Sequence, residues 1–389
     1  MRPIEIPDFS FNSPLANVVI ELERLRGDLG TSTTPSEVFG QLKQLFQLMT
    51  SIMSARIEGN RTSILEIVEG AQENTARDRS VRSAAPDFSD GVKEIILLEE
   101  ASKFIDEHIH AGTTISHALV RELHRIAVSG LEREGDRTPG SYRTTDVVIQ
   151  GSDHRPPPFA SIQADMQELL DFINQEMDRK FDLLKVAIAH HRFVWIHPFG
   201  NGNGRTCRLL TYAIMVSQGF TATTDYRAVD PTAVFGADRE SYYRHLEAAD
   251  SLEPATTIQW CTYLLGGMLK DLRKLNKLGN HDFVVDELLV PSLERARQAG
   301  IISLEEFEAL KIFAVRTTVK ATDLSNVVLG SSVVRSQFIR RLINRRLVEP
   351  IAEGKRSYRL VMAPGPLTPF ILRQLDKLEF LPQILRDDA

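Results

Sequence analysis

Cysteine is almost absent from this chain, and so are long apolar stretches. Two cysteines in 389 residues cannot build a disulfide framework, so a reducing cytoplasm is the expected compartment. Residues 1–10 carry acidic residues and prolines where a signal peptide would have an apolar run. The apolar stretch at 209–216 is far too short to span a bilayer. These absences predict a soluble, cytoplasmic protein with no membrane partner.

Positive charge is also in short supply. The chain has 46 Lys and Arg residues against 52 Asp and Glu residues, a net charge of −6. This balance argues against a surface that coats nucleic acid, although a local basic patch remains compatible with it. Apolar residues make up 42% of the sequence and recur mostly at helical spacing, with no internal repeat. We therefore expect a mainly α-helical globular protein of two or three domains.

The most informative part of the sequence is a twelve-residue stretch at 197–208. A titratable imidazole, His197, is followed by a glycine-rich loop and then by Arg205 and Arg208. Glycines allow backbone N–H groups to turn inward toward an anion, and arginines bind phosphate oxygens. The proline after His197 should end the preceding apolar helix, and a new helix should cover 205–218. Because a helix N-terminus favours anions, the stretch predicts a phosphate site beside a base.

This stretch resembles the signature of the Fic family: His-Pro-Phe, any residue, Asp or Glu, Gly-Asn-Gly-Arg, any two residues, Arg. Eight of the twelve positions match, and Asn201 stands at the acidic position. The resemblance implies transfer of AMP from ATP to a Ser, Thr or Tyr hydroxyl of a target protein or of the protein itself. His197 would be the general base, and Arg205 and Arg208 would contact the β- and γ-phosphates. The nucleotide-binding residues that it implies are Gly202, Asn203, Gly204, Arg205, Thr206, Arg208 and Tyr242.

Each of these residues also has an ordinary structural interpretation. A histidine at a helix end can bind a backbone carbonyl, and Gly-Asn-Gly is a common surface turn. Arg205 and Arg208 could form an exposed basic face, and Tyr242 could be a core residue. However, two cations at a helix N-terminus are unfavourable unless an anion binds there. The combination therefore favours a function over packing alone.

Asn201 is the one departure from the signature. The family's acid at this position ligates Mg²⁺, which prefers hard oxygen ligands and usually at least one carboxylate. An amide oxygen is a neutral, weaker ligand. Either the nucleotide phosphates hold the metal, or transfer is slow, or the transferred group is not AMP. Transfer of UMP or of a phosphocholine group stays open for this reason.

A second motif lies near the N-terminus, at Ser54-Ala55-Arg56-Ile57-Glu58-Gly59. It resembles the inhibitory motif of Fic proteins, which lies on a helix before the catalytic core. The resemblance implies that Ser54, Glu58 and Gly59 are inhibitory residues and that Glu58 pairs with Arg208. In some relatives the same Glu also activates a water that removes AMP. A helix end capped by Gly59 explains the sequence equally well by itself.

Residues 137–158 predict a β-hairpin ahead of the glycine-rich loop. Residues 146–151 are a short extended run with β-branched side chains, and three prolines at 156–158 exclude a helix. Fic proteins carry a hairpin flap here that holds the target by strand addition. The resemblance therefore implies that Val147, Val148 and Ile149 bind the target.

The C-terminal part is expected to be a winged helix-turn-helix. Its first helix would cover 321–328, its recognition helix 332–345 and its hairpin wing 347–361. The window 316–361 has ten Lys and Arg residues against three acidic residues, a net charge of +7. We expect Arg335, Arg340 and Arg341 to contact DNA. A protein-binding winged helix or a solvated face is the alternative.

These observations combine into one hypothesis and one main alternative. The first is a Mg²⁺-dependent protein adenylyltransferase that uses ATP and is inhibited by Glu58. The second is a DNA-binding transcriptional regulator with a weak or nucleotide-sensing Fic core. The oligomeric state is left open, a homodimer included. The expected units are an N-terminal helical region at 1–89, the Fic core at 90–280, the winged helix at 281–365 and a tail at 366–389.

Overall fold

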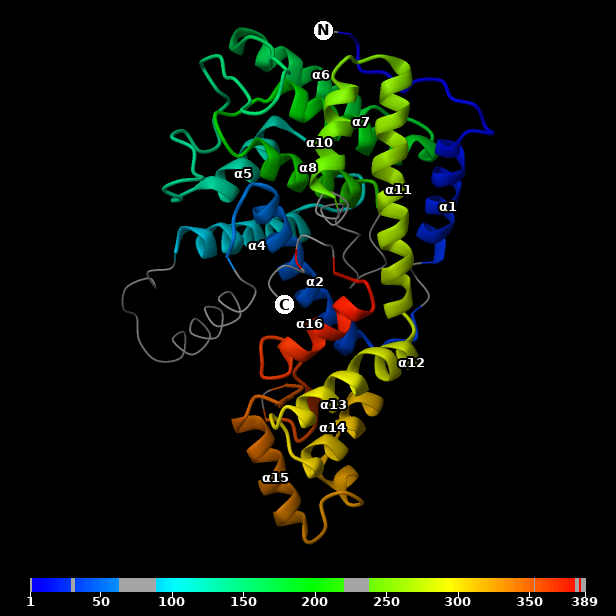
Figure 1. Cartoon of the computed structure of the whole chain (residues 1–389), viewed down its shortest axis with the longest axis vertical. Coiled ribbons are helices and arrows are strands. Elements are labelled where there is room, and N and C mark those ends of the chain that lie inside the picture. Colours follow the sequence, from blue (N-terminus) through cyan, green and yellow to red (C-terminus); the bar gives the residue numbers. More distant parts are fainter. Residues whose placement is uncertain are drawn as a thin grey trace.

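The computed structural model describes residues 2–28, 32–62, 89–219, 238–352, 354–381 and 385. As predicted, the described chain is mainly helical, and its one sheet has two short strands. A broad part contains α4 to α11, and a narrower part contains α12 to α15 (Figure 1). The helix α2 of the broad part and the helix α16 of the narrower part lie where the two parts meet, and the N-terminus lies at the far end of the broad part.

The helices of the broad part surround the segment that carries the phosphate motif. They are α1 (Pro14–Asp28), α2 (Ser36–Ile57), α4 (Asp90–His108), α5 (His117–Val128), α6 (Ile162–Asn174), α7 (Asp182–Ile196), α8 (Asn203–Ser217), α10 (Arg239–Ala249) and α11 (Pro254–Leu278), with short 3₁₀ turns η1 (Phe159–Ser161) and η2 (Arg179–Phe181).

The narrower part continues directly from α11. Its elements are α12 (His281–Phe283), the π-helix η3 (Val284–Leu289), α13 (Val290–Gln298), α14 (Leu304–Arg316), η4 (Ala321–Leu324), α15 (Ser332–Asn344), β1 (Val348–Pro350), β2 (Tyr358–Leu360) and α16 (Thr368–Lys377). The predicted domain boundaries stay predictions, and the one at 89 borders residues 63–88, which lie outside the described part.

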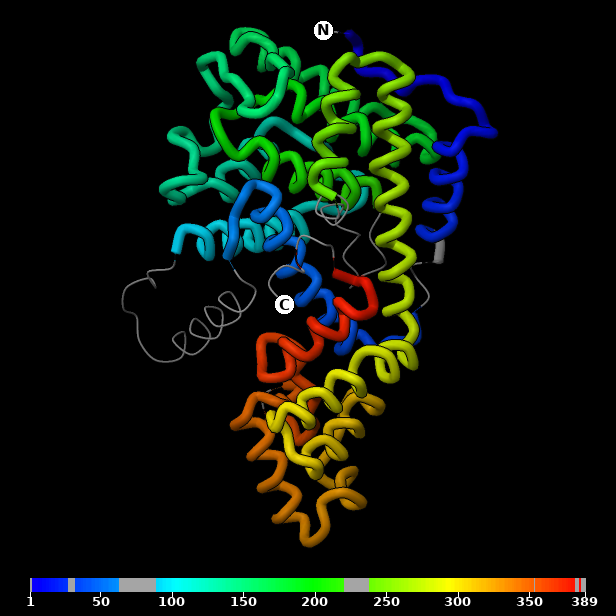
Figure 2. The backbone as a smooth tube through the Cα atoms, viewed as in Figure 1, coloured from blue at the N-terminus to red at the C-terminus, as the bar shows by residue number. Residues whose placement is uncertain are grey.

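The central helix α7 explains why the phosphate motif is so well supported. Twelve of its fifteen residues are buried, and it packs against α6, α8 and α11 (Figure 2). An all-round apolar sequence such as this one is stable only when other helices surround it. The buried residues form one continuous core that runs from Ile4 to Leu385. The loop after α7 is therefore anchored at the centre of the protein.

Helix ends follow the capping chemistry of the sequence. The Ser116 side chain accepts a hydrogen bond from the backbone N–H of Leu119 at the start of α5. Ser303 and Glu306 form a reciprocal capping box at the start of α14. Such caps satisfy N–H groups that have no partner within the helix, and each one contributes roughly 1 kcal/mol. They fix the boundaries of α5 and α14 at these residues.

The helix α2 contacts both parts of the molecule. Near its start, the buried Gln41 donates to the carbonyl of Leu360 at 2.8 Å and accepts from the N–H of Met362 at 2.8 Å. At its other end it packs against α4 and α8. The motif that contains Glu58 therefore sits at the end of a 22-residue helix that begins beside the C-terminal hairpin.

The C-terminal elements follow the predicted order. The helix predicted at 332–345 is α15, and the predicted wing contains the antiparallel pair β1–β2. The helix predicted at 321–328 is only the 3₁₀ turn η4. Assignment of this part as a winged helix-turn-helix stays a prediction.

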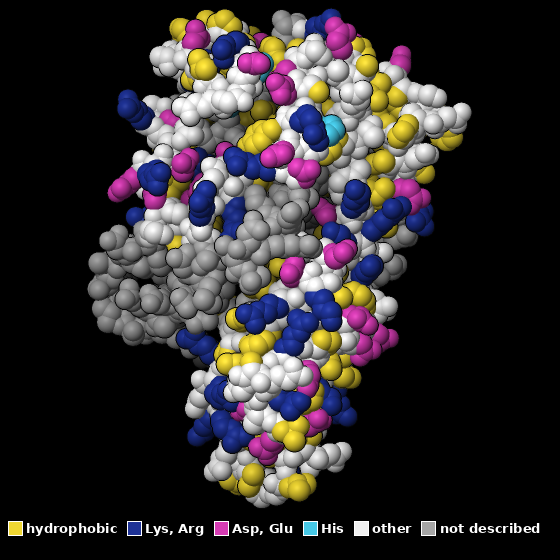
Figure 3. All heavy atoms as spheres, viewed as in Figure 1, with side chains coloured by type: hydrophobic (Ala, Val, Ile, Leu, Met, Phe, Trp, Pro, Cys, Tyr) yellow, Lys and Arg dark blue, Asp and Glu magenta, His cyan; other side chains and the backbone are white. Residues whose placement is uncertain are grey.

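The three arginines predicted to contact DNA differ in their surroundings. The Arg335 guanidinium donates to the carbonyl of Gly330 at 2.7 Å, and Arg341 pairs with Glu305 at 3.1 Å. Arg340 is exposed and makes no polar contact with any described residue. Lys and Arg side chains cover much of the visible face of this part, interspersed with Asp and Glu (Figure 3).

No helix in the described stretches of the chain combines the length and apolarity that crossing a bilayer requires.

Candidate active site

The stretch 197–208 forms a tight loop between α7 and α8. Helix α7 ends at Ile196, as predicted, and the N–H of His197 donates to the carbonyl of Phe193 at 3.0 Å. His197 has left-handed backbone angles, with φ 51° and ψ 61°. Helix α8 begins at Asn203, two residues earlier than predicted. The loop therefore feeds directly into a helix N-terminus, which favours anions.

Gly202 is required at the point where the loop enters α8. Its φ is 73°, a conformation that L side chains rarely adopt, and a Cβ there would lie 2.5 Å from Val128 Cγ1. Any other residue would push the loop away from α5. The glycine predicted to let the backbone approach phosphates thus also has a packing role.

The imidazole of His197 is held in one tautomer and in its neutral form. Its Nδ1 lies 3.3 Å from the carbonyl oxygen of Val194, which selects the tautomer with hydrogen on Nδ1. Burial lowers the pKa of His197 to about 4, and the hydrogen bond to Val194 only partly opposes this shift. The ring is therefore neutral at pH 7, with the lone pair of Nε2 free to take a proton.

Two predicted nucleotide-binding side chains hold the loop itself. The amide of Asn203 accepts from the N–H of Phe199 at 2.9 Å and donates to the carbonyl of Phe199 at 2.9 Å. The hydroxyl of Thr206 donates to the carbonyl of Gly202 at 2.9 Å. These bonds fold the loop back on itself so that it needs no ligand to keep its shape. Nucleotide contacts by Asn203 and Thr206 stay predictions.

Arg208 is held by the motif at the end of α2. Its Nε donates to the hydroxyl of Ser54 at 2.8 Å, and its Nη2 donates to Glu58 Oε1 at 2.7 Å. Arg208 is buried, whereas the side chain of Glu58 is 27% exposed. Desolvation raises the pKa of Glu58, but the charge and the hydrogen bond of Arg208 lower it by more. The net shift is downward, so the carboxyl is ionised. The predicted ion pair between Glu58 and Arg208 is therefore present.

Both interpretations of the 54–59 motif describe real features. Gly59 has φ 101°, and its N–H closes the last turn of α2 on the carbonyl of Arg56 at 3.0 Å. Glu58 meanwhile lies over the start of α8, where a Cβ on Gly204 would come within 2.2 Å of its Oε1. The helix cap thus positions the carboxylate above the phosphate loop.

Arg205 does not share the environment of Arg208. It is 1% exposed, and its Nη1 donates to Glu94 Oε1 at 3.0 Å while its Nη2 donates to the carbonyl of Glu134 at 2.6 Å. Glu94 is equally buried, and Asn60 donates to its other oxygen at 2.7 Å. Arg205 therefore ties α8 to α4, and its predicted contact with a phosphate stays a prediction. Its Nε has no hydrogen-bond partner among the described residues.

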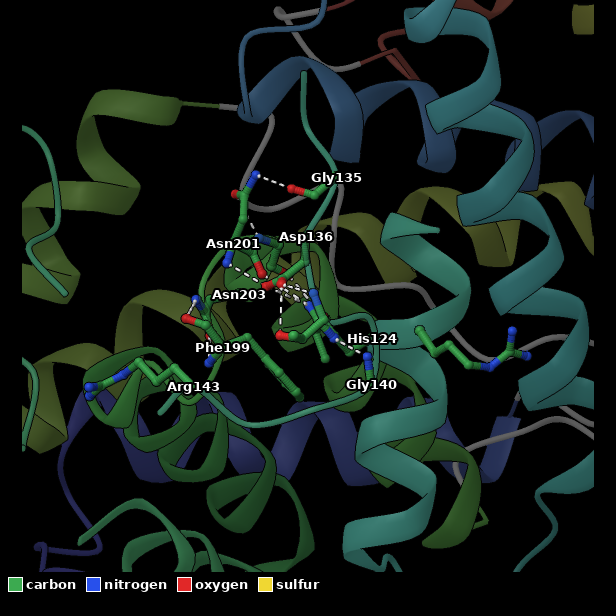
Figure 4. A network of polar contacts seen from close by, with 12 residues as sticks. His124, Gly135, Asp136, Gly140, Arg143, Phe199, Asn201 and Asn203 are labelled. Atoms are coloured by element: carbon green, nitrogen blue, oxygen red, sulfur yellow. Dashed lines mark hydrogen bonds and ion pairs between the residues drawn. The ribbon is translucent and has the colours of Figure 1, made fainter. Parts of the chain in front are cut away.

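A polar cluster that the sequence did not indicate holds Asn201 (Figure 4). The N–H of Asn201 donates to Asp136 Oδ2 at 2.9 Å, and its carbonyl accepts from His124 Nε2 at 3.0 Å. The N–H of Gly140 donates to His124 Nδ1 at 2.9 Å, which fixes the neutral tautomer. Burial lowers the pKa of His124 to about 4. The ring also stacks on Phe199, with 3.7 Å between ring centres.

Arg143 fixes the other end of the loop. Its backbone N–H donates to the carbonyl of Pro198 at 2.9 Å, and its Nε donates to the carbonyl of His197 at 2.9 Å. Figure 4 shows Arg143 well apart from the pair of His124 and Asp136. The backbone of the loop is thus held at two separated points.

The predicted β-hairpin is not a paired sheet. Residues 141–158 are extended and turn near Gln150 and Gly151, but they contain no strand. The prolines at 156–158 have no N–H groups to donate to a ladder, which explains why the arms do not pair. Contacts of the Arg143 side chain join the arms in its place, at Thr145 and Pro157.

The three residues predicted to bind the target occupy the first arm of this flap. Val148 is 68% exposed, whereas Val147 and Ile149 are partly buried. Target binding by these residues stays a prediction. The other peripheral candidate, Tyr242, is buried, and its hydroxyl lies 3.0 Å from His190 Nε2. Tyr242 therefore belongs to the wall behind Arg208, and the next residue, Tyr243, is 43% exposed.

The site so described is a glycine-containing loop that leads into a helix N-terminus, with a neutral imidazole beside it. Residues 114–215, which contain this loop, match the family model described as Fic/DOC family. The chain therefore carries a Fic/DOC family domain.

Relatives and solved structures agree with this assignment. The protein adenylyltransferase Fic of Nematostella vectensis is 31% identical over 159 residues, which are 40% of this chain and 34% of that protein. The protein of the same name from Drosophila grimshawi is 30% identical over 189 residues, 47% of this chain and 36% of its own length. The chain thus spans about a third of the length of these curated relatives.

Two crystal structures have the same fold. A Fic family protein from Desulfovibrio desulfuricans G20 has a TM-score of 0.54 and 20% identity, covering 92% of this chain and 99% of its own. A Fic domain containing signaling protein from Bacteroides thetaiotaomicron has a TM-score of 0.51 and 18% identity, covering 69% of this chain and 97% of its own.

Proposed function

We propose that this protein is a protein adenylyltransferase that Glu58 holds in an inhibited state. The observation that carries the proposal is the short loop that leads from neutral His197 into the N-terminus of α8, on which Arg208 pairs with Glu58 at 2.7 Å. The relatives named protein adenylyltransferase support the choice of AMP over another transferred group.

The chemistry follows from these groups. ATP lies with its phosphates on the N-terminus of α8, and Arg208 neutralises their terminal charge once Glu58 withdraws. The hydroxyl oxygen of the target attacks the α-phosphorus, and His197 Nε2 takes the hydroxyl proton. The bond from the α-phosphorus to the bridging oxygen breaks, and pyrophosphate leaves. Positioning and charge neutralisation supply most of the rate enhancement in such transfers.

The resident groups do not fit a protein-held Mg²⁺ at Asn201. The amide oxygen of Asn201 accepts from the N–H of Gly202 at 2.7 Å, and its Nδ2 donates to the carbonyl of Gly135 at 3.1 Å. The nearby Asp136 carboxylate already accepts from the N–H groups of Asn201 and Thr138. Among the described residues, no group of three His, Cys, Asp or Glu side chains is arranged to hold a metal. We therefore assign no step to a metal held by this residue.

The test is incorporation of label from α-³²P-ATP into the protein or into bands of a cell lysate. Glu58→Gly should incorporate label, and adding His197→Ala should abolish it because it removes the imidazole that takes the proton. Glu37→Gly, an exposed position on the same helix, is the matched control and should behave as wild type. Competition by UTP or CDP-choline identifies a different transferred group. Absence of label from Glu58→Gly in both preparations would refute the proposal, and loss of pre-formed AMP from a labelled band would indicate removal.

A specific observation also favours DNA as a second partner. Besides Val333, Val334 and the paired Arg341, the exposed residues of α15 are polar, include no acid and form no hydrogen bond or ion pair with another described side chain. These residues are Ser332, Ser336, Gln337, Arg340 and Asn344. Such a face suits a duplex groove. Cytoplasmic location and a homodimer stay expectations.

Retardation of duplex DNA in a gel tests this second role. Arg340→Ala should weaken binding several-fold and reduce the slope of binding against salt concentration by about one. Arg373→Ala, an exposed arginine on α16, is the control. Equal retardation of both variants over a salt series would count against a role for α15.

A further inference from the structure

Arg143 stands out because its side chain is buried yet donates its hydrogen bonds to backbone carbonyls. It is 6% exposed, and its donors reach three segments: Nε to His197 at 2.9 Å, Nη1 to Thr145 at 3.0 Å and Nη2 to Pro157 at 2.6 Å. The nearest described carboxylate, Asp146, lies 3.7 Å away and is 70% exposed. Desolvation lowers the pKa of Arg143. A buried charge is retained at such a site when its fixed fork of donors is needed.

The three carbonyls belong to parts with different roles. Thr145 and Pro157 lie on the two arms of the flap, next to the residues expected to bind the target. His197 is the base. The arms share no ladder of hydrogen bonds, and the Arg143 side chain is hydrogen-bonded to both arms and to the base at once. A second contact, from His154 Nε2 on the second arm to the carbonyl of Trp195 at 2.7 Å, ties the flap to the end of α7.

The backbone of His197 needs this support. Its φ of 51° is a left-handed conformation that destabilises a non-glycine residue by roughly 1–2 kcal/mol. The N–H of the same residue is tied to α7, and its carbonyl is tied to Arg143. Without the guanidinium, the peptide between His197 and Pro198 can rotate toward an unstrained conformation, which moves the ring.

We propose that Arg143 is a positioning residue that couples the flap to the catalytic base. A target segment lying along the flap is thereby held at a fixed distance from His197 Nε2, so that its hydroxyl meets the base and the α-phosphorus together. This inference rests on the proposed function. It predicts that Arg143 affects the transfer step and leaves ATP binding intact, since none of its contacts reaches α8.

The test compares Arg143→Ala, Arg143→Lys and Arg155→Ala, all in the Glu58→Gly protein. Arg155 is an exposed arginine on the same flap and serves as the matched control. The maximal rate of self-labelling should fall about 10–100-fold in Arg143→Ala, because a displacement of about 1 Å at a reacting group has an effect of that size. KM for ATP should stay unchanged. Lysine offers a single donor group and should restore little of the rate.

Amide hydrogen exchange supplies the readout that does not depend on activity. Arg143→Ala should speed exchange both in the flap at 144–157 and at 197–199, while Arg155→Ala speeds neither. Faster exchange in the flap alone, or an unchanged labelling rate, would overturn the coupling. A loss of activity that only follows the unfolded fraction in a thermal melt would also do so. If Glu58→Gly itself takes up no label, the proposed function fails. The hydrogen-exchange data would then still show whether Arg143 couples the flap to the backbone at His197.

Discussion

The loop at 197–204 is held on two sides by different chemistry. On the α2 side, Arg208 of the adjoining helix α8 donates to Ser54 and forms an ion pair with Glu58, whose side chain is 27% exposed. On the opposite side, the buried groups His124, Asp136 and Arg143 bind the loop backbone directly. On the α2 side, Glu58 binds the Arg208 side chain, and a phosphate can bind that side chain in place of Glu58. On the other side, the partners are backbone atoms of the loop, and a ligand does not take the place of these hydrogen bonds.

The contact with Glu58 is therefore suited to regulation, whereas the hydrogen bonds to the loop backbone maintain the shape of the loop. The carboxylate of this ion pair is 27% exposed, so a phosphate can replace it as the partner of the buried arginine. Breaking a hydrogen bond between buried groups is strongly destabilising because the partner that is left unpaired stays buried. We therefore expect substitutions on the two sides to act with opposite signs on activity.

The largest effect should come from a matched pair of charge-removing substitutions. Glu58→Gln frees Arg208 for the γ-phosphate and should raise the labelling rate by about 5–150-fold, the range of a coupling of 1–3 kcal/mol. Asp136→Asn removes the charge that holds Asn201 and Thr138, and should lower both the labelling rate and stability, by about 2 kcal/mol. Labelling kinetics and urea unfolding measure the two. A rise in the labelling rate of both variants would contradict the expectation that the two sides act with opposite signs.

Folding stability measured over a range of pH tests the side of the loop that His124 holds. The pKa of His124 is about 4 in the folded protein and near 6.5 when unfolded, so the unfolded chain binds more protons between these values. Stability should therefore be fully present above pH 6.5 and fall as the pH drops toward 4, with His124 responsible for up to about 3 kcal/mol.

His124→Gln keeps a donor for the carbonyl of Asn201 and removes the titrating group, so its urea stability should depend less on pH in this window. His110→Gln, at an exposed histidine, is the control. An identical loss of stability on acidification in wild type and His124→Gln would contradict a buried, neutral His124.

The smallest effect should come from restoring the family's acid. Asn201→Asp supplies the carboxylate that Mg²⁺ prefers, at the cost of the hydrogen bond to Gly135. In the Glu58→Gly background, calorimetry should show that EDTA lowers the affinity for ATP more in Asn201→Asp than in the protein that keeps Asn201. Asn201→Ser, which adds no charge, is the control. Equal metal dependence in all three proteins would show that position 201 does not decide how metal is held.

The sequence predicted those parts of the site that lie within short motifs. The end of α7, the helix after the loop and the pair of Glu58 with Arg208 are all present. These predictions succeeded because glycines, a proline and a recognisable spacing constrain the backbone locally. The same motif gave no indication that Arg205 pairs with Glu94, which lies on a helix over a hundred residues earlier.

The groups that hold the loop left no comparable signal. His124 lies 77 residues before Asn201, on an ordinary amphipathic helix, and Asp136 lies in an irregular turn. Only the packing of α5 against α8 brings them to the loop. The flap was misread for a related reason. Its β-branched run suggested strands, whereas the prolines of the second arm leave too few donors for pairing.

The inhibition that we propose for Glu58 depends on the absence of a Cβ atom at position 204. Alanine would suit the start of α8 at least as well as glycine, yet its methyl carbon would fall 2.2 Å from the Glu58 oxygen that accepts from Arg208. That oxygen is the end of a flexible side chain, so an added methyl group would displace the carboxylate and leave the helix intact. In the proposed mechanism, control of the enzyme thus depends on one Cα without a side chain.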